Sequence, residues 1–470
     1  MHDLLPPMPR RRAIALLAAT AGGAAWPAAA ALRERTPLQR LKATVARARP
    51  PAPRAVPITV TQGAPYQAVS SFGAQAAIVP APLGIDVNPN PVTPADLAVL
   101  GGFRRAQWTP FDAGFIPTEP GGGSWYRAVT YQHRHASTQC QALAAFHFQF
   151  DGAALELLFA GRDVQLVCIA DGEYQTPQFI ARTLQGGVEG ELLAYDTFTR
   201  LDFGSVARRR LSVYTQSSLG LRAFAHAGDA RVRAWDRSSE PVMSVMADSY
   251  GAAASRAWPT AAIFHEAGAA LGIAQVDVDA IGGTGYASNS VFPLPGDTFV
   301  GRLPGMAALP ADLFLVAGGI NDNISQALPP YASAQQALAA FTAAVGQYYR
   351  DLRAALPGAV IAALGPWQPN EQYLPEVALQ KLDIVRAALA ATAGPWVLVD
   401  NLRGGWLASN GATGPATGPW QTGTGNSGAP HGDGNGDVYV GPDGTHPTAA
   451  GASYLAGRIA DALRAAIAAL

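Results

Sequence analysis

The hydrophobic positions of the chain follow two patterns, which meet near residue 240. Between residues 58 and 240, short runs rich in β-branched and aromatic residues alternate with turn sequences such as Asp151-Gly152 and Asp171-Gly172. No long helical period interrupts them. Strands at such regular spacing predict an all-β domain, a sandwich of the jelly-roll type. The clearest runs are Phe146–Phe150, Leu155–Phe159, Val164–Cys168 and Arg210–Tyr214.

From residue 241 to residue 470 the pattern changes, because apolar runs now alternate with Ala-rich helical stretches. Strands that are apolar along their whole length, separated by helices, predict a parallel sheet covered on both faces. We therefore expect a doubly wound α/β domain. The predicted strands are Val242–Ala247, Ile273–Ile281, Leu313–Ala317, Val360–Leu364 and Trp396–Val399, and the predicted helices lie near 253–270, 332–355, 374–393 and 448–469.

The N-terminal residues 1–31 have the pattern of a signal peptide. Arg10, Arg11 and Arg12 precede a short apolar stretch that ends in a run of alanines. A charged start, an apolar middle and small residues at the end are typical of secretory signals, and the arginine pair fits the twin-arginine route. This predicts export to the periplasm or medium of a bacterium. Residues 32–57, rich in Arg and Pro, are expected to form a solvated basic linker or a short helix leading to a tether.

Composition narrows the classes of protein further. Only 14% of the 470 residues are charged and the formal net charge is −1, so there is no electrostatic case for nucleic acid as a partner. No apolar run reaches the roughly 18 residues that a membrane-spanning helix needs. The two cysteines, Cys140 and Cys168, are compatible with a disulfide or with two buried thiols.

Chemistry in doubly wound sheets is found beyond the carboxyl ends of the strands, where three candidates occur. Ser249 follows the first strand, in Asp248-Ser249-Tyr250, as a nucleophile or a helix cap. Gly283 follows the second strand, where a glycine lets a backbone N–H approach a ligand or forms a tight turn. Asn321 follows the third strand, as an amide donor or an Asx turn.

A serine nucleophile needs a base, and the base needs a group that orients it. His446 lies just before the last predicted helix, and Asp443 stands three residues earlier, in the only Asp-x-x-His of the chain. One turn can direct that carboxylate at the imidazole. His431 is a weaker candidate for the base, and His265 falls in the middle of a predicted helix.

Together, the four blocks resemble the SGNH (GDSL-type) hydrolase family, whose motifs carry Ser, Gly, Asn and His in this order. The segments Gly319-Ile320-Asn321-Asp322 and Asp443-Gly444-Thr445-His446-Pro447 match closely, whereas Ala247 stands where the family usually has Gly. The resemblance covers about residues 241–470. A β domain placed before such a domain is also similar to the layout of some carbohydrate esterases of the acetylxylan type.

The resemblance implies a serine esterase that works without a metal or an organic cofactor. Ser249, His446 and Asp443 would form the catalytic triad, and the N–H groups of Ser249 and Gly283 with the Asn321 amide would form the oxyanion hole. The first choice of substrate is an O-acetyl or other short acyl ester on a polysaccharide, since export and a sandwich domain fit such a target. Trp367 and Gln368, after the fourth strand, are candidates for substrate binding, and Trp406 and Trp420 lie in the long loop 403–442.

Other functions stay open at this point. They are an acyltransferase acting on glycans, a lipase-like, lysophospholipase-like or aryl esterase, and an inactive glycan-binding protein. An α/β-hydrolase is a weaker alternative, because that fold separates its acid from its His along the chain. Asp433-Gly-Asn435-Gly-Asp437 resembles a calcium loop but lacks the EF-hand Gly and Glu, and His133 and His135 have no third ligand nearby. No metal site is therefore predicted.

Overall fold

The structure is a computed structural model, and it describes most of the C-terminal half of the chain and the strands of the β region. Predictions made for the signal segment 1–31, His133, His135, Cys140, Trp420, His431 and Asp433 lie outside the described residues. They remain predictions. The described residues are 35–48, 59–62, 77–80, 126–127, 143–160, 166–170, 196–216, 220–227, 229–234, 240–252, 263–287, 298–307, 311–369, 375–407, 428 and 435–470.

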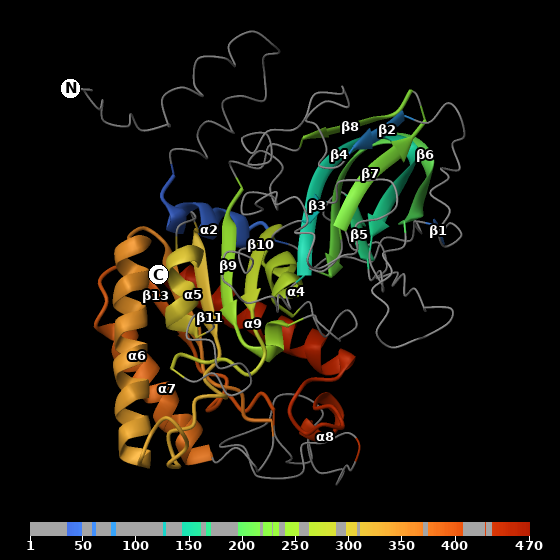
Figure 1. Ribbon diagram of the computed structural model, residues 1–470. Helices are drawn as coiled ribbons and strands as arrows, with labels where there is room; N and C mark the ends of the chain where they lie inside the picture. The colour runs from blue at the N-terminus through green and yellow to red at the C-terminus, as the bar shows by residue number, and fades with distance from the viewer. Residues whose placement is uncertain are drawn as a thin grey trace, which may run out of the picture.

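A five-stranded parallel sheet forms the centre of the C-terminal domain, in the order β10-β9-β11-β12-β13 (Figure 1). Every residue of β9, β11 and β12 is buried, as apolar strands covered on both faces require. The predicted parallel sheet is confirmed, and its second strand is shorter than expected. The strands are β9 (Val242–Ala247), β10 (Gln275–Ala280), β11 (Leu313–Ala317), β12 (Val360–Leu364) and β13 (Trp396–Val399).

Helices cover both faces of this sheet (Figure 1). The helices α4 (Ile263–Ala270) and α9 (Ala449–Ala469) pack on one face, and α5 (Phe299–Met306), α6 (Ala334–Ala355) and α7 (Pro375–Ala390) pack on the other. The sequence pattern did not predict α5, because Pro304 and two glycines lower its helix propensity. Within the described part of the chain, no helix has the length and apolarity needed to cross a membrane.

A further helix, α2 (Pro37–Val45), lies within the stretch expected to be a linker. Thr36 caps it, with Gln39 completing a capping box. Leu41 and Val45 are buried in the same core as α4, α9 and one face of the sheet. The short-helix alternative therefore holds for this segment, and the solvated linker is wrong for it, because two apolar residues one turn apart give the helix a face to bury.

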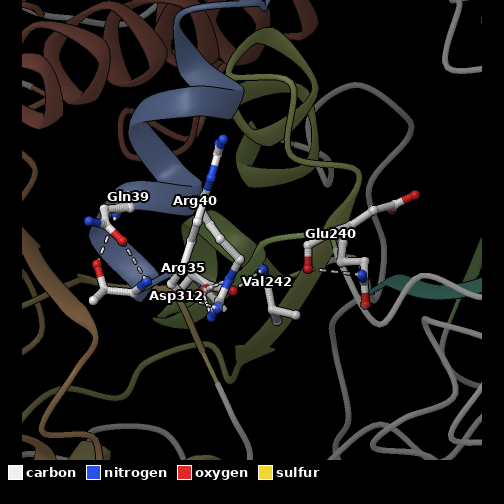
Figure 2. Close-up of polar contacts among 8 residues, drawn as sticks. Arg35, Gln39, Arg40, Glu240, Val242 and Asp312 are labelled. Atoms are coloured by element: carbon white, nitrogen blue, oxygen red, sulfur yellow. Dashed lines mark hydrogen bonds and ion pairs between the residues drawn. The ribbon is translucent and has the colours of Figure 1, made fainter. Parts of the chain in front are cut away.

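An ion pair fastens α2 to the edge of the sheet where the strands begin (Figure 2). The Arg40 guanidinium donates to Asp312 Oδ1, with a Nε–Oδ1 distance of 2.8 Å. The other carboxylate oxygen of Asp312 accepts the N–H of Val242, the first residue of β9, at 2.9 Å. Arg40 and Asp312 are 272 positions apart in the sequence. A segment that precedes the β region is thus part of the α/β domain that follows it.

The region before β9 is all-β, as predicted, and its described strands form one eight-stranded antiparallel sheet. Two long strands, β4 (Leu143–Ala160) and β6 (Asp196–Gln216), pair along most of their length, with a register shift between Gly152 and Ala154. A sandwich of two packed sheets remains a prediction. The remaining strands are β1 (Thr59–Gln62), β2 (Ala77–Pro80), β3 (Tyr126–Arg127), β5 (Leu166–Ala170), β7 (Gly220–His226) and β8 (Arg231–Ala234).

One of the chain's two lysines holds the loop that follows β11. Lys381 lies on α7, and its Nζ donates to the carbonyls of Gly319 at 2.8 Å and Ile320 at 3.4 Å. Burial lowers the pKa of Lys381 to about 8, although the nearby Asp322 carboxylate opposes this shift. The two carbonyls belong to the residues just before Asn321, so the lysine fixes the backbone from which that side chain extends.

We expect the Leu41→Ala variant to be destabilised by about 2–5 kcal/mol, because it leaves a cavity where α2 meets the domain core. Urea unfolding followed by tryptophan fluorescence measures the change. Arg47→Ala, at an exposed position just beyond the helix, is the control and should stay near wild type. Equal stability of wild type and Leu41→Ala would show that α2 does not belong to the domain.

The lowered pKa of Lys381 predicts a particular pH dependence. The unfolded chain, with a lysine pKa of 10.5, binds a proton that the folded protein releases near pH 8. Stability contributed by this group therefore rises between those two pH values, by about 3 kcal/mol in total. The free energy of unfolding of wild type, minus that of Lys381→Met, should rise over the same interval. A difference that stays flat from pH 7 to 10.5 would contradict this prediction.

Candidate active site

Ser249 stands at the end of β9, in the first turn after the strand. Asp248 caps the short 3₁₀ helix η4 (Ser249–Gly251) by accepting the N–H of Tyr250 at 3.0 Å. The capping role considered for Ser249 thus belongs to Asp248. Ser249 is partly exposed while its neighbours Asp248 and Tyr250 are buried. The turn therefore presents the serine at the carboxyl edge of the sheet.

A chain of hydrogen bonds joins Ser249 to the last loop of the domain. His446 Nε2 lies 2.8 Å from Ser249 Oγ, and His446 Nδ1 lies 2.6 Å from Asp443 Oδ2. Ser249 and His446 are 197 positions apart in the sequence. The structure thus brings the predicted serine, imidazole and carboxylate together in the predicted order.

The Asp443 carboxylate also organises the turn that carries His446. Its Oδ1 accepts the backbone N–H of Thr445 at 3.0 Å and of His446 at 2.9 Å. Partial burial by itself raises the pKa of Asp443, but the hydrogen bonds from these two N–H groups and from the imidazole outweigh it, so the pKa is lowered. Asp443 thus stays ionised and bonds the imidazole at Nδ1, which leaves Nε2 toward the serine.

Tyr250 supports this arrangement from below. Its ring stacks on Trp367 at a centroid distance of 4.5 Å and lies 5.8 Å from the His446 ring. Its hydroxyl donates to the carbonyl of Thr445. The residue after the serine therefore braces the loop that carries the histidine, which sequence analysis did not anticipate.

The loop after β10 and the loop after β11 are bonded to one another. The Asn321 amide donates to the carbonyl of Thr284 at 2.9 Å, and the Asp322 carboxylate accepts the N–H groups of Tyr286 and Ala287, each at 2.9 Å. An amide carries two N–H groups, so the bond to Thr284 orients Asn321 and leaves the second N–H for a ligand.

Two glycines in the loop after β10 have distinct roles. Gly283 has a φ of +75°, which favours glycine, whereas Gly282 and Gly285 do not have a positive φ. A Cβ at Gly285 would instead lie 2.1 Å from the Asp322 carboxylate. Backbone conformation thus distinguishes Gly283 from its neighbours.

A pocket of about 210 Å³ adjoins these loops. Trp367 and Gln368 line it and are themselves almost fully buried. Lys381 forms part of the same wall, although sequence analysis did not assign it to the site. Its rarity in a chain whose basic residues are nearly all arginine was the available signal. The other lining residues are Ile320, Asn323, Ser325, Gln326, Pro366, Val377 and Ala378.

Two further candidates lie away from the serine. His265 is buried in α4, and burial lowers the pKa of its imidazole to about 4. Trp406 is buried under the Arg458 guanidinium, 5.4 Å from its ring, and its carbonyl accepts bonds from Asn435 and Tyr454. Trp406 therefore packs the loop. Among the described residues, no group of three or more His, Cys, Asp or Glu side chains is placed to hold a metal ion.

This geometry fits nucleophilic catalysis. An imidazole within hydrogen-bond reach of a serine hydroxyl can accept its proton, and a carboxylate on the other ring nitrogen fixes the tautomer. Amide and backbone N–H groups at the ends of neighbouring strands are donors of the kind that stabilise an oxyanion.

Comparisons with solved structures returned proteins of similar architecture at low sequence identity. A family two carbohydrate esterase from Clostridium thermocellum, in complex with cellohexaose, is 15% identical with a TM-score of 0.46, covering 70% of this chain and 95% of that one. A salicylyl-acyltransferase from a tetracycline biosynthetic pathway is 16% identical with a TM-score of 0.43, covering 69% and 82%. An acetyl xylan esterase from Butyrivibrio proteoclasticus is 13% identical with a TM-score of 0.43, covering 68% and 89%.

The sequence matched no curated protein. A family model did match it: residues 244–453 fit the GDSL-like lipase/acylhydrolase family. The matched range runs from β9 into α9 and contains Ser249, Gly283, Asn321, Asp443 and His446. The α/β domain of this chain therefore belongs to the GDSL-like lipase/acylhydrolase family of ester-hydrolysing enzymes.

Proposed function

We propose that the protein is a serine esterase that cleaves short acyl esters on carbohydrate through an acyl-enzyme intermediate. The observation that carries the proposal is the hydrogen-bond chain from Asp443 through His446 to Ser249. Membership of its α/β domain in an acylhydrolase family supports the same reaction class.

In the first step, Ser249 Oγ attacks the ester carbonyl as His446 Nε2 takes the hydroxyl proton. The tetrahedral intermediate collapses, the bond to the alcohol oxygen breaks, and His446 returns the proton to the leaving alcohol. In the second step, His446 deprotonates a water that attacks the acyl-enzyme, and the acid leaves as Ser249 regains its proton. Asp443 stabilises the imidazolium throughout.

The oxyanion formed in each step needs donors aimed at it. We assign this role to the N–H groups of Ser249 and Gly283 and to the Asn321 amide. They stand at the carboxyl ends of β9, β10 and β11, which are neighbours in the sheet. Each such donor is typically worth roughly 10²–10³ in rate.

The pocket beside the site supports a polar substrate with a small acyl group. Five of its ten lining residues are polar: Asn323, Ser325, Gln326, Gln368 and Lys381. A long acyl chain would be better served by a lining without them, because burial against apolar surface is what binds such a chain. We assign Trp367 and Gln368 to substrate binding as walls of this pocket. Export, inferred from the N-terminal residues, is part of the same proposal.

Ser249→Ala should abolish turnover of p-nitrophenyl acetate while the fold survives, because it removes the nucleophile from an otherwise intact chain of hydrogen bonds. Steady-state kinetics and circular dichroism of both proteins test this. Ser325→Ala, at an exposed position on the pocket rim, is the matched control and should retain turnover. Undiminished turnover in the Ser249 variant would refute the mechanism.

The substrate class is tested with a panel of purified esters: acetylated xylan, p-nitrophenyl acetate, p-nitrophenyl palmitate and a feruloyl ester. We expect the highest kcat/KM for acetyl esters and release of acetate from the glycan. Preference for the palmitoyl ester would replace the carbohydrate assignment with a lipase-like one. Product analysis with a free sugar acceptor separates hydrolysis from acyl transfer, since a transferase would produce the acylated sugar.

A further inference from the structure

A fully buried arginine lies directly beneath the candidate active site. Arg302, on α5, has no solvent exposure. Its Nη1 donates to Asp279 Oδ1 on β10 at 2.5 Å. Its Nη2 donates to the carbonyl of Ala247 at 3.1 Å and to Thr284 Oγ1 at 3.0 Å. A single guanidinium thus bonds to the end of β9, to β10 and to the loop after β10.

Each of these bonds leads to one of the groups assigned to the oxyanion hole. Ala247 is two residues before Ser249, and Thr284 directly follows Gly283. The carbonyl of Thr284 accepts the Asn321 amide at 2.9 Å. Thr284 Oγ1 also donates to the carbonyl of Ile281 at 2.7 Å, which closes the loop on itself. The backbones that carry all three donors are therefore connected through Arg302 and Thr284.

The buried pair is an unfavourable choice for stability alone. Two charges taken out of water lose hydration that their attraction repays only partly, and apolar replacements of such pairs are often neutral or stabilising. Because Asp279 neutralises the guanidinium at 2.5 Å, the pair adds little net charge near the reacting atoms. What the guanidinium contributes is a rigid fork that bonds several acceptors in fixed directions.

We propose that Arg302 is a positioning residue, which holds the donors of Ser249, Gly283 and Asn321 at the spacing that the oxyanion requires. This inference rests on the proposed function and adds to it a residue that does not touch the substrate. Misplacement of a catalytic group by about 1 Å costs on the order of 100-fold in rate. Loss of the fork should therefore appear in the chemical step rather than in substrate binding.

The main test is the double variant Arg302→Met/Asp279→Leu, which removes both charges and leaves neither one buried alone. With p-nitrophenyl acetate we expect kcat to fall about 10- to 100-fold while KM changes less than about two-fold. Affinity for a phenylboronic acid, which forms a tetrahedral adduct with the serine, should fall in parallel with kcat. Assays run well below the melting temperature of each variant.

Arg353 provides a matched control, because it is also a buried arginine whose guanidinium bonds to backbone carbonyls. Its partners are the carbonyls of Leu356, Pro357, Ala359 and Pro395, before β12 and β13, at the opposite edge of the sheet from Ser249. Arg353→Met should lower the melting temperature and leave kcat unchanged. Equal losses of kcat in the two variants would assign the effect of Arg302 to stability.

A second pair of variants keeps the proposal testable if the double variant does not fold. Thr284→Val removes the hydroxyl that joins Arg302 to the loop, at nearly constant volume, whereas Thr284→Ser retains it. We expect Thr284→Val to lower kcat about 10-fold with KM unchanged, and Thr284→Ser to recover most of that loss. Wild-type kcat in both Thr284→Val and the double variant would overturn the positioning role. Since wild-type turnover and its loss in Ser249→Ala are measured first, that outcome would leave the esterase mechanism standing.

Discussion

Burial of the central strands on both faces is the constraint on which the rest of the structure depends. Every side chain of β9, β11 and β12 lies under a covering layer, so polar groups within the strands need partners inside the protein. Reactive groups that must meet water and substrate are therefore placed just beyond the last strand residue. Ser249 and Asn321 stand at such positions, two and four residues after their strands.

The same constraint explains why the loops at this edge are bonded to one another rather than only to solvent. Asp322 takes backbone N–H groups of the preceding crossover, and Lys381 reaches across from α7 to carbonyls before Asn321. A substrate that displaces water from this edge meets groups already oriented by the fold, so little reorganisation remains for the reaction itself.

Sequence patterns predicted the sheet and the candidate triad because both depend on local signals. The apolar runs give β9 to β13 nearly residue by residue, and the Asp-x-x-His spacing gives one turn that joins Asp443 to His446. The buried contacts could not be predicted this way. Arg302, Thr284 and Tyr250 act on residues far along the chain, and α5 contains Pro304 and glycines that hide its helical character. Such partners are defined only when distant segments meet.

The clamp between Arg40 and Asp312 also bears on the order in which the molecule folds. Synthesis of the chain releases α2 before the β region, whereas its docking surface consists of β9, α4 and α9, all made later. Leu41 and Val45 must therefore wait, unpaired, for about 200 residues of chain. Contacts of such long sequence separation slow folding, because the loop between them is closed at an entropic cost. The last helix of the chain, α9, completes the core that receives the first described one, so a ribosome-bound chain has no finished catalytic domain until its C-terminus emerges.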